Sequence, residues 1–214
     1  CKGIIDSAPD ISKIDVTPTG YSTTVLAANG EETATLVGQG ANRQYVTIDE
    51  IPLDLQHAFV AIEDERFYDH NGIDLHGIGR AFISGLSKGR FSEGASTITQ
   101  QLIKNNVLTS WTSETSFVEK LQRKIQEQYL ALELEKRVND KDWILENYMN
   151  SVNLGANTLG VQAASKKYFN KDVSELTLSE ASVIAGITQN PSGYNPITHP
   201  DKNAKRREKG VKIT

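Results

Sequence analysis

The start of the chain carries no helical repeat of apolar residues. Residues 1–20 contain Asp, Ser and Pro without periodicity, which predicts an extended arm. Residues 22–28 and 33–37 then flank Asn29 and Gly30, a pair suited to the positive φ angles of a tight type I′ turn. The pattern therefore predicts one short β-hairpin behind an irregular arm.

After residue 48, apolar residues recur at helical spacing. The predicted stripes are Ile51, Leu55, Phe59 and Ile62; Leu75, Ile78, Phe82 and Leu86; Ile98 and Leu102; Phe117, Leu121, Ile125 and Leu132; and Trp143, Ile144 and Tyr148. The longest helix is predicted over Ser116–Val138, and another over Val161–Phe169. Thr177 and Glu180 have capping-box spacing, so they open a last helix that stops near Gly186.

Residues at the ends of these stripes support the same elements. Residues suited to helix starts are Pro52, Ser96, Thr97, Asn139 and Asp140. Pro191 and Pro196 favour extended backbone after the last predicted helix. Because no strand–helix alternation typical of a parallel sheet is present, the sequence predicts a mainly α fold with one small β feature. Residues 1–45 form the arm and hairpin, and residues 46–214 form the main domain.

Composition and charge narrow the possible classes of protein to a folded domain without an internal disulfide or a predicted membrane span. With 214 residues, 38% hydrophobic and 23% charged, the chain can form one substantial core. The net charge of −4 gives no reason to expect a nucleic-acid partner. Lys and Arg gather after residue 200, which fits a solvated tail, or contact with anionic lipid or a following domain. The single cysteine, Cys1, cannot form an internal disulfide, and no apolar run of roughly 18 residues predicts a membrane span.

An acidic run at the end of the first predicted helix is the first candidate for chemistry. It comprises Glu63, Asp64 and Glu65, and Phe67 and His70 follow it. Carboxylates crowded beside each other and beside apolar side chains are costly to ionise, which is how a protein tunes a general base. The alternative is a surface helix end with solvated acids, and a lone histidine after a helix usually caps or packs.

A second polar cluster lies where the third predicted helix begins. The small residues from Gly94 to Thr97 expose backbone N–H groups at a helix N-terminus, which favours anion binding. Gln100 and Lys104 share one face of that helix, with Gln101 adjacent. Two amides and an ammonium beside such a turn suit sugar hydroxyls and a phosphate, although a simple cap before a polar helix face is the alternative.

The third cluster lies on the longest predicted helix. Arg123 and Glu127 are four residues apart and Lys124 and Glu127 three apart, so all three can share one surface. Helix salt bridges alone would explain the spacing. As a functional cluster, the two bases suit a leaving group that bears phosphate, and the carboxylate suits a metal or polarising role.

These clusters, in this order, resemble the motifs of the peptidoglycan glycosyltransferases of family 51, the polymerising domain of bifunctional (class A) penicillin-binding proteins. Lys141 to Asn150, continuing to Ala164, resembles the fourth family motif, and Leu178 to Ala181, continuing to Asn195-Pro196, resembles the fifth. The resemblance covers about residues 46–207, with five motifs in the family's order.

The resemblance implies a lysozyme-like helical fold with a large lobe and a smaller, membrane-facing jaw. It also implies processive polymerisation of lipid II into β-1,4-linked glycan strands, with inversion and release of polyprenyl diphosphate. Glu63 matches the general base that deprotonates the acceptor sugar's 4-hydroxyl. Glu127 matches the second family acid, which binds a metal or orients substrate. Lys104, Arg123 and Lys124, with Mg²⁺ or Mn²⁺, would balance the charge of the diphosphate.

The resemblance also implies where substrate and partners bind. The substrate-binding residues it implies are Asp64, Phe67, His70, Gly94, Ser96, Thr97, Gln100, Gln101, Lys104, Asn105, Arg123 and Lys124. Implied partners are lipid II, the lipid-linked glycan chain, the outer face of the bacterial cell membrane and a transpeptidase domain that follows in the full protein. The segment Ile73–Phe91 fits a helix lying on an anionic membrane, or ordinary core packing.

Two other functions fit parts of the pattern. A lysozyme-like hydrolase or lytic transglycosylase also needs a glutamate, but it has no leaving diphosphate, so Lys104, Arg123 and Lys124 would be unexplained. A non-catalytic module that binds lipid II is the other alternative, and the presence of both Glu63 and Glu127 argues against it.

Overall fold

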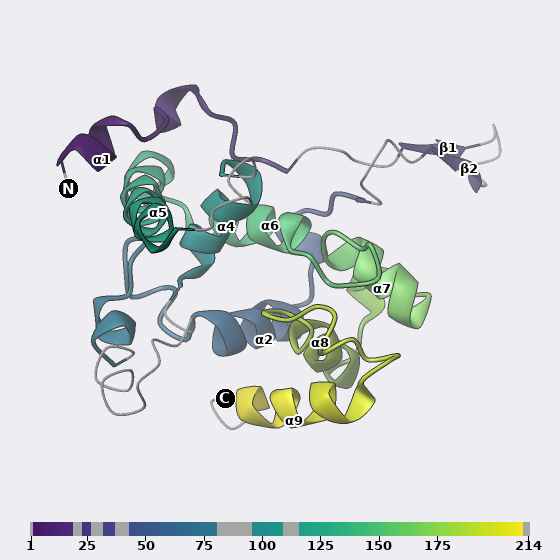
Figure 1. Cartoon of the computed structure of the whole chain (residues 1–214). Helices are drawn as coiled ribbons and strands as arrows, with labels where there is room; N and C mark the ends of the chain where they lie inside the picture. The colour runs from purple at the N-terminus through teal and green to yellow at the C-terminus, as the bar shows by residue number, and fades with distance from the viewer. Residues whose placement is uncertain are drawn as a thin grey trace. The chain divides into compact units, whose positions relative to one another are not determined.

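The computed structural model describes residues 2–18, 23–26, 32–36, 43–80, 96–108 and 116–211, which are mainly helical, as predicted (Figure 1). Its α-helices are α1 (Lys2–Asp6), α2 (Leu53–Glu63), α4 (Ile98–Asn106), α5 (Phe117–Val138), α6 (Lys141–Ser151), α7 (Val161–Phe169), α8 (Leu178–Ala185) and α9 (Pro200–Val211). Short 3₁₀ turns are η1 (Ile11–Lys13), η2 (Ile48–Glu50) and η4 (Val173–Glu175), and residues 75–80 are also helical.

Two short strands, β1 (Thr23–Leu26) and β2 (Glu32–Leu36), pair antiparallel. Thr23 lies opposite Leu36, and the register shifts between Val25 and Leu26. The predicted turn at Asn29-Gly30 lies outside the described residues.

The starts of three helices confirm the sequence prediction, because each is fixed by a reciprocal capping box. Thr97 and Gln100 form the box of α4, Ser116 and Glu119 that of α5, and Thr177 and Glu180 that of α8. In each box the cap side chain accepts a backbone N–H, and the acid or amide three residues later accepts the N–H of the cap. Asp140 caps α6 by accepting the Trp143 N–H at 3.0 Å.

The arm is not extended throughout, contrary to the prediction. It contains α1 and η1, and α1 lies beside α5 (Figure 1). Hydrogen bonds within the arm and to α5 stabilise these two elements, although the arm has no helical repeat of apolar residues. Asp10 accepts the Ser12 N–H at 3.0 Å and its hydroxyl at 2.6 Å, and these bonds lower the pKa of Asp10. Gln126 of α5 donates to the Ile4 carbonyl at 3.1 Å.

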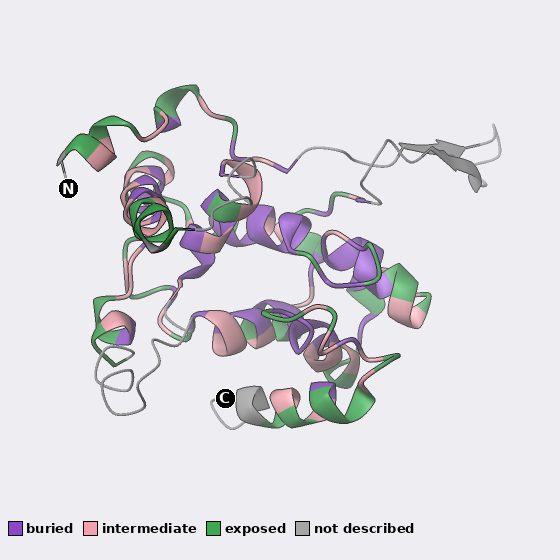
Figure 2. Ribbon diagram, in the orientation of Figure 1, coloured by how far each residue is buried: buried purple, intermediate pink, exposed green. Residues whose placement is uncertain are grey.

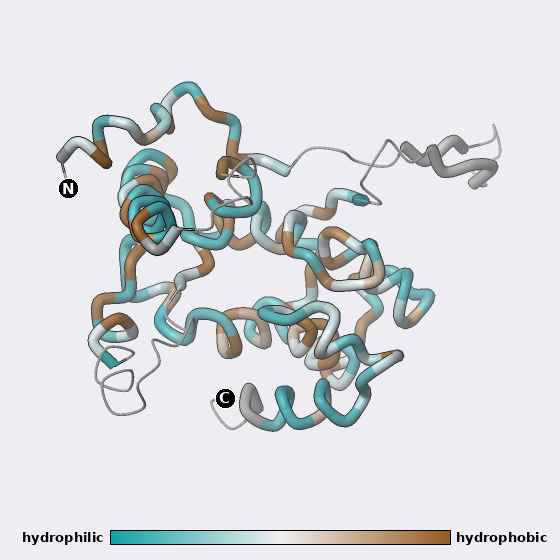
Figure 3. Tube along the Cα trace, viewed as in Figure 1, coloured by the Kyte–Doolittle hydropathy of each residue, from teal (hydrophilic) through white to brown (hydrophobic). Residues whose placement is uncertain are grey.

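The prediction that α8 is the last helix is also wrong, because α9 follows it. Pro200 occupies the first position of α9, where its fixed φ suits a helix and its missing N–H costs nothing. Asn203 is buried and donates to the carbonyls of Val183 and Tyr194, both at 3.0 Å. These bonds attach α9 to α8 and its following loop. Figure 3 shows that α9 is largely hydrophilic, so the spacing of apolar residues does not predict this helix.

The buried face of α5 differs from the predicted one. Leu121 and Leu132 are 51% and 42% exposed, whereas the buried residues of this helix are Gln126, Glu127, Leu130, Ala131, Leu134 and Glu135 (Figure 2). Three polar side chains therefore lie on the inner face, where each makes at least one hydrogen bond, and the apolar period misidentified that face. Leu75, from the second predicted stripe, is also exposed, and Phe82 and Leu86 lie outside the described residues.

The chain divides into two compact units, Cys1–Thr17 with Glu63–Leu145, and Pro18–Ile62 with Glu146–Thr214. The first unit buries Phe67, Ile98, Leu102, Ile103, Leu130, Leu134, Ile144 and Leu145. The second buries Leu55, Phe59, Tyr148, Met149, Leu154, Val161, Ile184 and Ile187. All the candidate site residues lie in the first unit, so its interior decides their geometry.

The Glu180 carboxylate at the start of α8 is expected to make folding sensitive to acid. A hydrogen bond from the Lys171 ammonium, 2.8 Å away, and one from the Thr177 N–H lower the pKa of Glu180 from 4.5 to about 2. A lowered pKa means that this stabilisation is present above pH 4.5 and is lost as pH falls through about 2. The Glu180→Gln variant keeps the cap but removes the charge, so its stability should depend less on pH in this window. Urea unfolding of both proteins across the window measures this, and parallel curves would contradict it.

Candidate active site

Glu63, the last residue of α2, is half-buried and contacts α4. Its Oε2 accepts a hydrogen bond from Gln101 Nε2 at 2.9 Å. Gln101 follows Gln100 directly, and Gln100 Oε1 accepts a hydrogen bond from Lys124 of the third predicted cluster. The structure therefore links the first and third predicted clusters through two neighbouring amides of the second.

The loop after Glu63 is fixed to the N-terminus of α4. Asp64 is 6% exposed and accepts the Ile98 N–H at 2.9 Å, while His70 Nε2 lies 2.9 Å from Asp64 Oδ1. The Gly72 N–H donates to His70 Nδ1 at 3.2 Å, so the proton lies on Nε2, which donates to Asp64. Asp64 and His70 thus order the backbone that follows Glu63.

The α4 N-terminus is less open to an anion than the sequence suggested. Asp64 takes the Ile98 N–H, and Thr97 Oγ1 accepts the Gln100 N–H at 3.2 Å. Thr97 Oγ1 also donates to the Gly72 carbonyl at 2.7 Å. Two of the donors expected to bind an anion are therefore occupied within the protein. Gly94 lies outside the described residues.

The second acid, Glu127, is 2% exposed and lies between two cations. Lys124 Nζ lies 2.9 Å from Glu127 Oε1, and Arg123 Nη1 lies 3.3 Å from Glu127 Oε2. Lys124 also donates to Ser96 Oγ at 2.6 Å and to Gln100 Oε1 at 3.3 Å. The ammonium of Lys124 therefore joins α5 to the start of α4, and it brings the second and third predicted clusters together.

The remaining predicted residues lie in contrasting surroundings. Gln100 is fully buried, and its Nε2 has no hydrogen-bond partner among the residues that the structure describes. Phe67 is fully buried, with its ring edge-on to Tyr68 and His70. On the last turns of α4, Lys104 is exposed and Asn105 is half-buried.

An ion pair between Arg66 and Asp74 stiffens the loop beyond His70. Arg66 Nη2 contacts Asp74 Oδ2, and the Gly77 N–H donates to Asp74 Oδ1 at 2.9 Å. Burial alone would raise the pKa of Asp74, but the Arg66 guanidinium and the Gly77 N–H outweigh burial and lower it. Asp74 therefore stays ionised and keeps the loop closed onto residues 75–80.

The donor set around Glu127 does not fit a divalent cation. Each Glu127 oxygen already faces a positive side chain, and Mg²⁺ or Mn²⁺ prefers several oxygen ligands. Among the described residues, no group of three or more His, Cys, Asp or Glu side chains could hold a metal ion. Lys124 and Arg123 are therefore the positive charges that this cluster offers.

The sequence analysis did not propose Glu135 or Lys141 as site residues, although both lie next to the loop that follows Glu63. Lys141 Nζ lies 2.7 Å from Glu135 Oε1 and donates to the His70 carbonyl at 2.7 Å. Lys141 belongs to the segment that resembles the fourth motif, but its partner His70 lies 71 residues earlier. No local pattern indicates such a contact.

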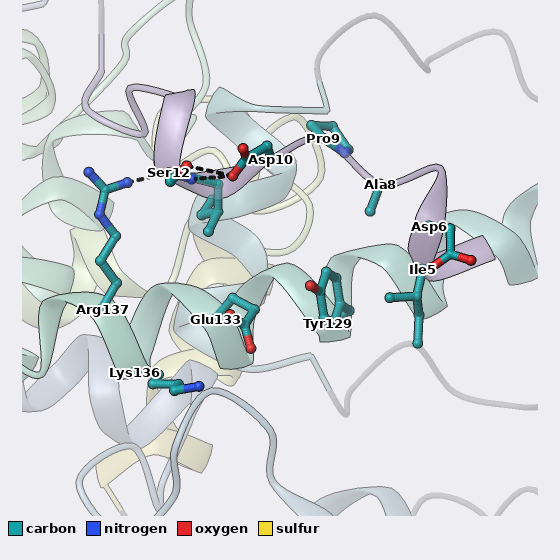
Figure 4. Close-up of a pocket in the computed structure, with 11 residues that line it drawn as sticks. Ile5, Asp6, Ala8, Pro9, Asp10, Ser12, Tyr129, Glu133, Lys136 and Arg137 are labelled. Atoms are coloured by element: carbon teal, nitrogen blue, oxygen red, sulfur yellow. Dashed lines mark hydrogen bonds between the residues drawn. The ribbon is translucent and has the colours of Figure 1, made fainter. Parts of the chain in front are cut away.

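A hollow of about 520 Å³ lies between the arm and α5 (Figure 4). Ile5, Pro9 and Asp10 line it from the arm, and Tyr129 and Lys136 from α5. None of the candidate site residues lines this hollow. It is therefore separate from the cluster around Glu63 and Glu127.

Comparisons with known proteins agree with the motif resemblance. Residues 29–212 match the family model described as transglycosylase. The chain is 46% identical over 187 residues to penicillin-binding protein 1F of Bacillus subtilis, covering 87% of this chain and 25% of that protein. It is 40% identical over 205 residues to penicillin-binding protein 1A/1B of the same organism, covering 95% of this chain and 21% of that protein.

A third relative and a solved structure complete the comparison. Penicillin-binding protein 1A of Clostridium botulinum is 48% identical over 167 residues, covering 75% of this chain and 19% of that protein. The crystal structure of penicillin-binding protein 1A from Haemophilus influenzae aligns with a TM-score of 0.44 at 22% identity, covering 92% of this chain and 18% of that one. The chain thus spans a quarter or less of the length of these relatives. No described helix is both long and apolar enough to cross a bilayer.

Proposed function

The chain belongs to the transglycosylase family, the peptidoglycan glycosyltransferase domains of class A penicillin-binding proteins, and from this premise we propose its reaction. The domain transfers the growing lipid-linked glycan chain onto lipid II, processively and with inversion, and releases polyprenyl diphosphate. The observation that carries this proposal is the link between two acidic residues through α4: Gln101 donates to Glu63, and its neighbour Gln100 accepts a hydrogen bond from Lys124, which pairs with Glu127.

The two carboxylates suit different tasks. Both oxygens of Glu127 face the cationic side chains of Lys124 and Arg123, so this carboxylate is placed to hold those two bases. Glu63 is half-buried and its Oε2 accepts a hydrogen bond from the Gln101 amide, which orients a carboxylate of the kind that serves as a general base. Glu63 is therefore the general base, and Glu127 holds Lys124 and Arg123 in place.

The proposed step is a displacement at the anomeric carbon of the lipid-linked chain. Glu63 takes the proton of the acceptor 4-hydroxyl while that oxygen forms the new glycosidic bond. The bond to the diphosphate breaks on the opposite side, which inverts the configuration. Lys104, Arg123 and Lys124 stabilise the negative charge that develops on the leaving diphosphate.

The other predicted residues are assigned two kinds of role. Ser96, Gln100, Gln101 and Asn105 are proposed to contact the substrate, together with Gly94 and the Thr97 backbone. Asp64, Phe67 and His70 are buried or hydrogen-bonded within the loop, so we assign them a role in shaping it rather than in touching sugar.

The same proposal places the domain at the membrane. Its substrates carry polyprenyl chains, so a membrane surface is the expected partner, at the extracytoplasmic face of the bacterial cell membrane. A lysozyme-like arrangement of a large lobe and a membrane-facing jaw, and a transpeptidase domain in the full protein, belong to this proposal.

Incubation with lipid II, and separately with finished glycan, tests the proposed reaction. Growth of glycan strands from lipid II, with release of polyprenyl diphosphate, is the expected result. Shortening of finished glycan without growth from lipid II would assign the domain to the hydrolases. Binding of lipid II without either reaction would assign it to the non-catalytic modules.

The Lys104→Ala variant is expected to turn over lipid II roughly 10- to 100-fold more slowly, because a charge-assisted hydrogen bond to phosphate contributes about 1.5–3 kcal/mol. Lys104 is exposed on α4, so the fold should be unaffected. Affinity for an analogue that carries diphosphate should fall, while affinity for the sugars alone should not. Lys120→Ala, an exposed lysine on α5, is the matched control. Equal losses for both analogues would refute the role of Lys104.

A further inference from the structure

A largely buried ion pair lies against the loop that follows Glu63. Lys141, the first residue of α6, donates to Glu135 Oε1 and to the His70 carbonyl, both at 2.7 Å. The Glu135 side chain is 6% exposed, and the ammonium lies 4.5 Å from the centroid of the Phe67 ring. One charged group therefore ties the loop to α5 and α6.

The same pair also reaches α4. Thr99 is fully buried, and its hydroxyl donates to Glu135 Oε1 at 2.6 Å. One carboxylate oxygen thus accepts bonds from two helices. Asp64, next to Glu63 in the chain, accepts the Ile98 N–H, so the loop and α4 are also joined directly. These contacts hold the loop that follows Glu63 and the helix that carries its partner Gln101.

We propose that Lys141 and Glu135 are positioning residues, whose ion pair holds the loop and α4 so that Glu63 stays within reach of Gln101. This inference rests on the proposed function. A buried ion pair adds little net stability, since well-packed apolar replacements are often as stable. Its geometry matters more, because a misplacement of about 1 Å can lower a rate by roughly 10²-fold.

Three proteins separate positioning from stability: wild type, Lys141→Met, and the double variant Lys141→Met with Glu135→Gln. The single variant leaves Glu135 charged and unpaired, so both its melting temperature and its kcat on lipid II should fall. The double variant removes the unpaired charge and should recover the melting temperature, while its kcat stays roughly 10- to 100-fold below wild type and its KM changes less than about threefold. Recovery of kcat together with stability would overturn the proposal.

Hydrogen exchange gives a readout that does not depend on activity. In the double variant, the Ile98 N–H that bonds Asp64 should exchange at least about 10-fold faster, because the loop opens locally. Amides of α7, in the other unit, should exchange at the wild-type rate. An unchanged Ile98 rate would overturn the proposal even if polymerisation is confirmed. If wild type makes no polymer, the proposed function fails, and the Ile98 rate still decides whether the pair positions the loop.

Lys171→Met is the matched control. Lys171 also pairs with a glutamate, Glu180, at 2.8 Å, but in the unit that lacks the candidate site. Its kcat should equal that of wild type. A loss as large as that of Lys141→Met would mean that removal of any such ion pair slows the enzyme, and the positioning role would be withdrawn.

Discussion

Replacing Glu63 with glutamine is expected to lower the turnover of lipid II by roughly 10²–10⁴-fold, the usual contribution of a general base. Glutamine matches glutamate in size and can still meet Gln101, so the fold should survive. The loss should appear in kcat, because the base acts while the acceptor hydroxyl is deprotonated. Strand growth from lipid II measures it, with the melting temperature as a check on folding.

The acidic run supplies a matched control for this experiment. Glu65 lies two residues further on and is exposed, so Glu65→Gln removes the same charge from the same loop. Its turnover should stay within about threefold of wild type, since exposed charges contribute little. If Glu63→Gln keeps near-normal turnover, or both variants lose it equally, the base lies elsewhere.

The Gly72→Ala variant is expected to lose roughly 2–5 kcal/mol of the free energy of unfolding. Gly72 has φ +90°, a conformation that costs other residues about 1–2 kcal/mol. An added Cβ would also lie 2.7 Å from the Ala131 carbonyl oxygen on α5, and overpacking adds about 1–3 kcal/mol. The loop would have to move away from α5, and polymerisation should fall with it. Urea unfolding measures the change.

Gly79→Ala is the companion measurement. Gly79 lies in the helical residues 75–80, and a Cβ there would meet nothing within 4 Å. Alanine favours a helix over glycine by about 1 kcal/mol, so this variant should be unchanged or slightly more stable. Similar losses in the two variants would show that the contact between Gly72 and Ala131 is unimportant.

Local signals explain how much of the fold could be predicted. Thr97, Ser116 and Thr177 each determine a helix start through residues only three positions away, and all three starts were predicted. The helix α9 could not be predicted in this way, because Asn203 holds it in place. The partners of Asn203 are Val183 in α8 and Tyr194 in the loop after α8. A prediction based on the spacing of apolar residues contains no information about hydrogen bonds between residues far apart in the chain.

The same limit applies to the site. The inner face of α5 carries Glu127 and Glu135, which an apolar stripe assigns to solvent. The motif resemblance singled out Glu127 despite this, together with Lys124 and Arg123. Neither periodicity nor resemblance indicated that Glu135 pairs with Lys141, because the pair matters through its contact with His70, far away in the chain.

The buried amide nitrogen of Gln100 has a consequence for ligand binding. A buried donor without an acceptor costs about 1–3 kcal/mol, and Gln100 Nε2 bears that cost beside Lys124. A saccharide oxygen that reaches this nitrogen would relieve the cost, so occupancy and thermal stability should rise together. An analogue lacking that oxygen should bind more weakly and, at the same concentration, raise the melting temperature less. The Gln100 amide thus offers one buried donor through which ligand affinity and the stability of the fold would be coupled.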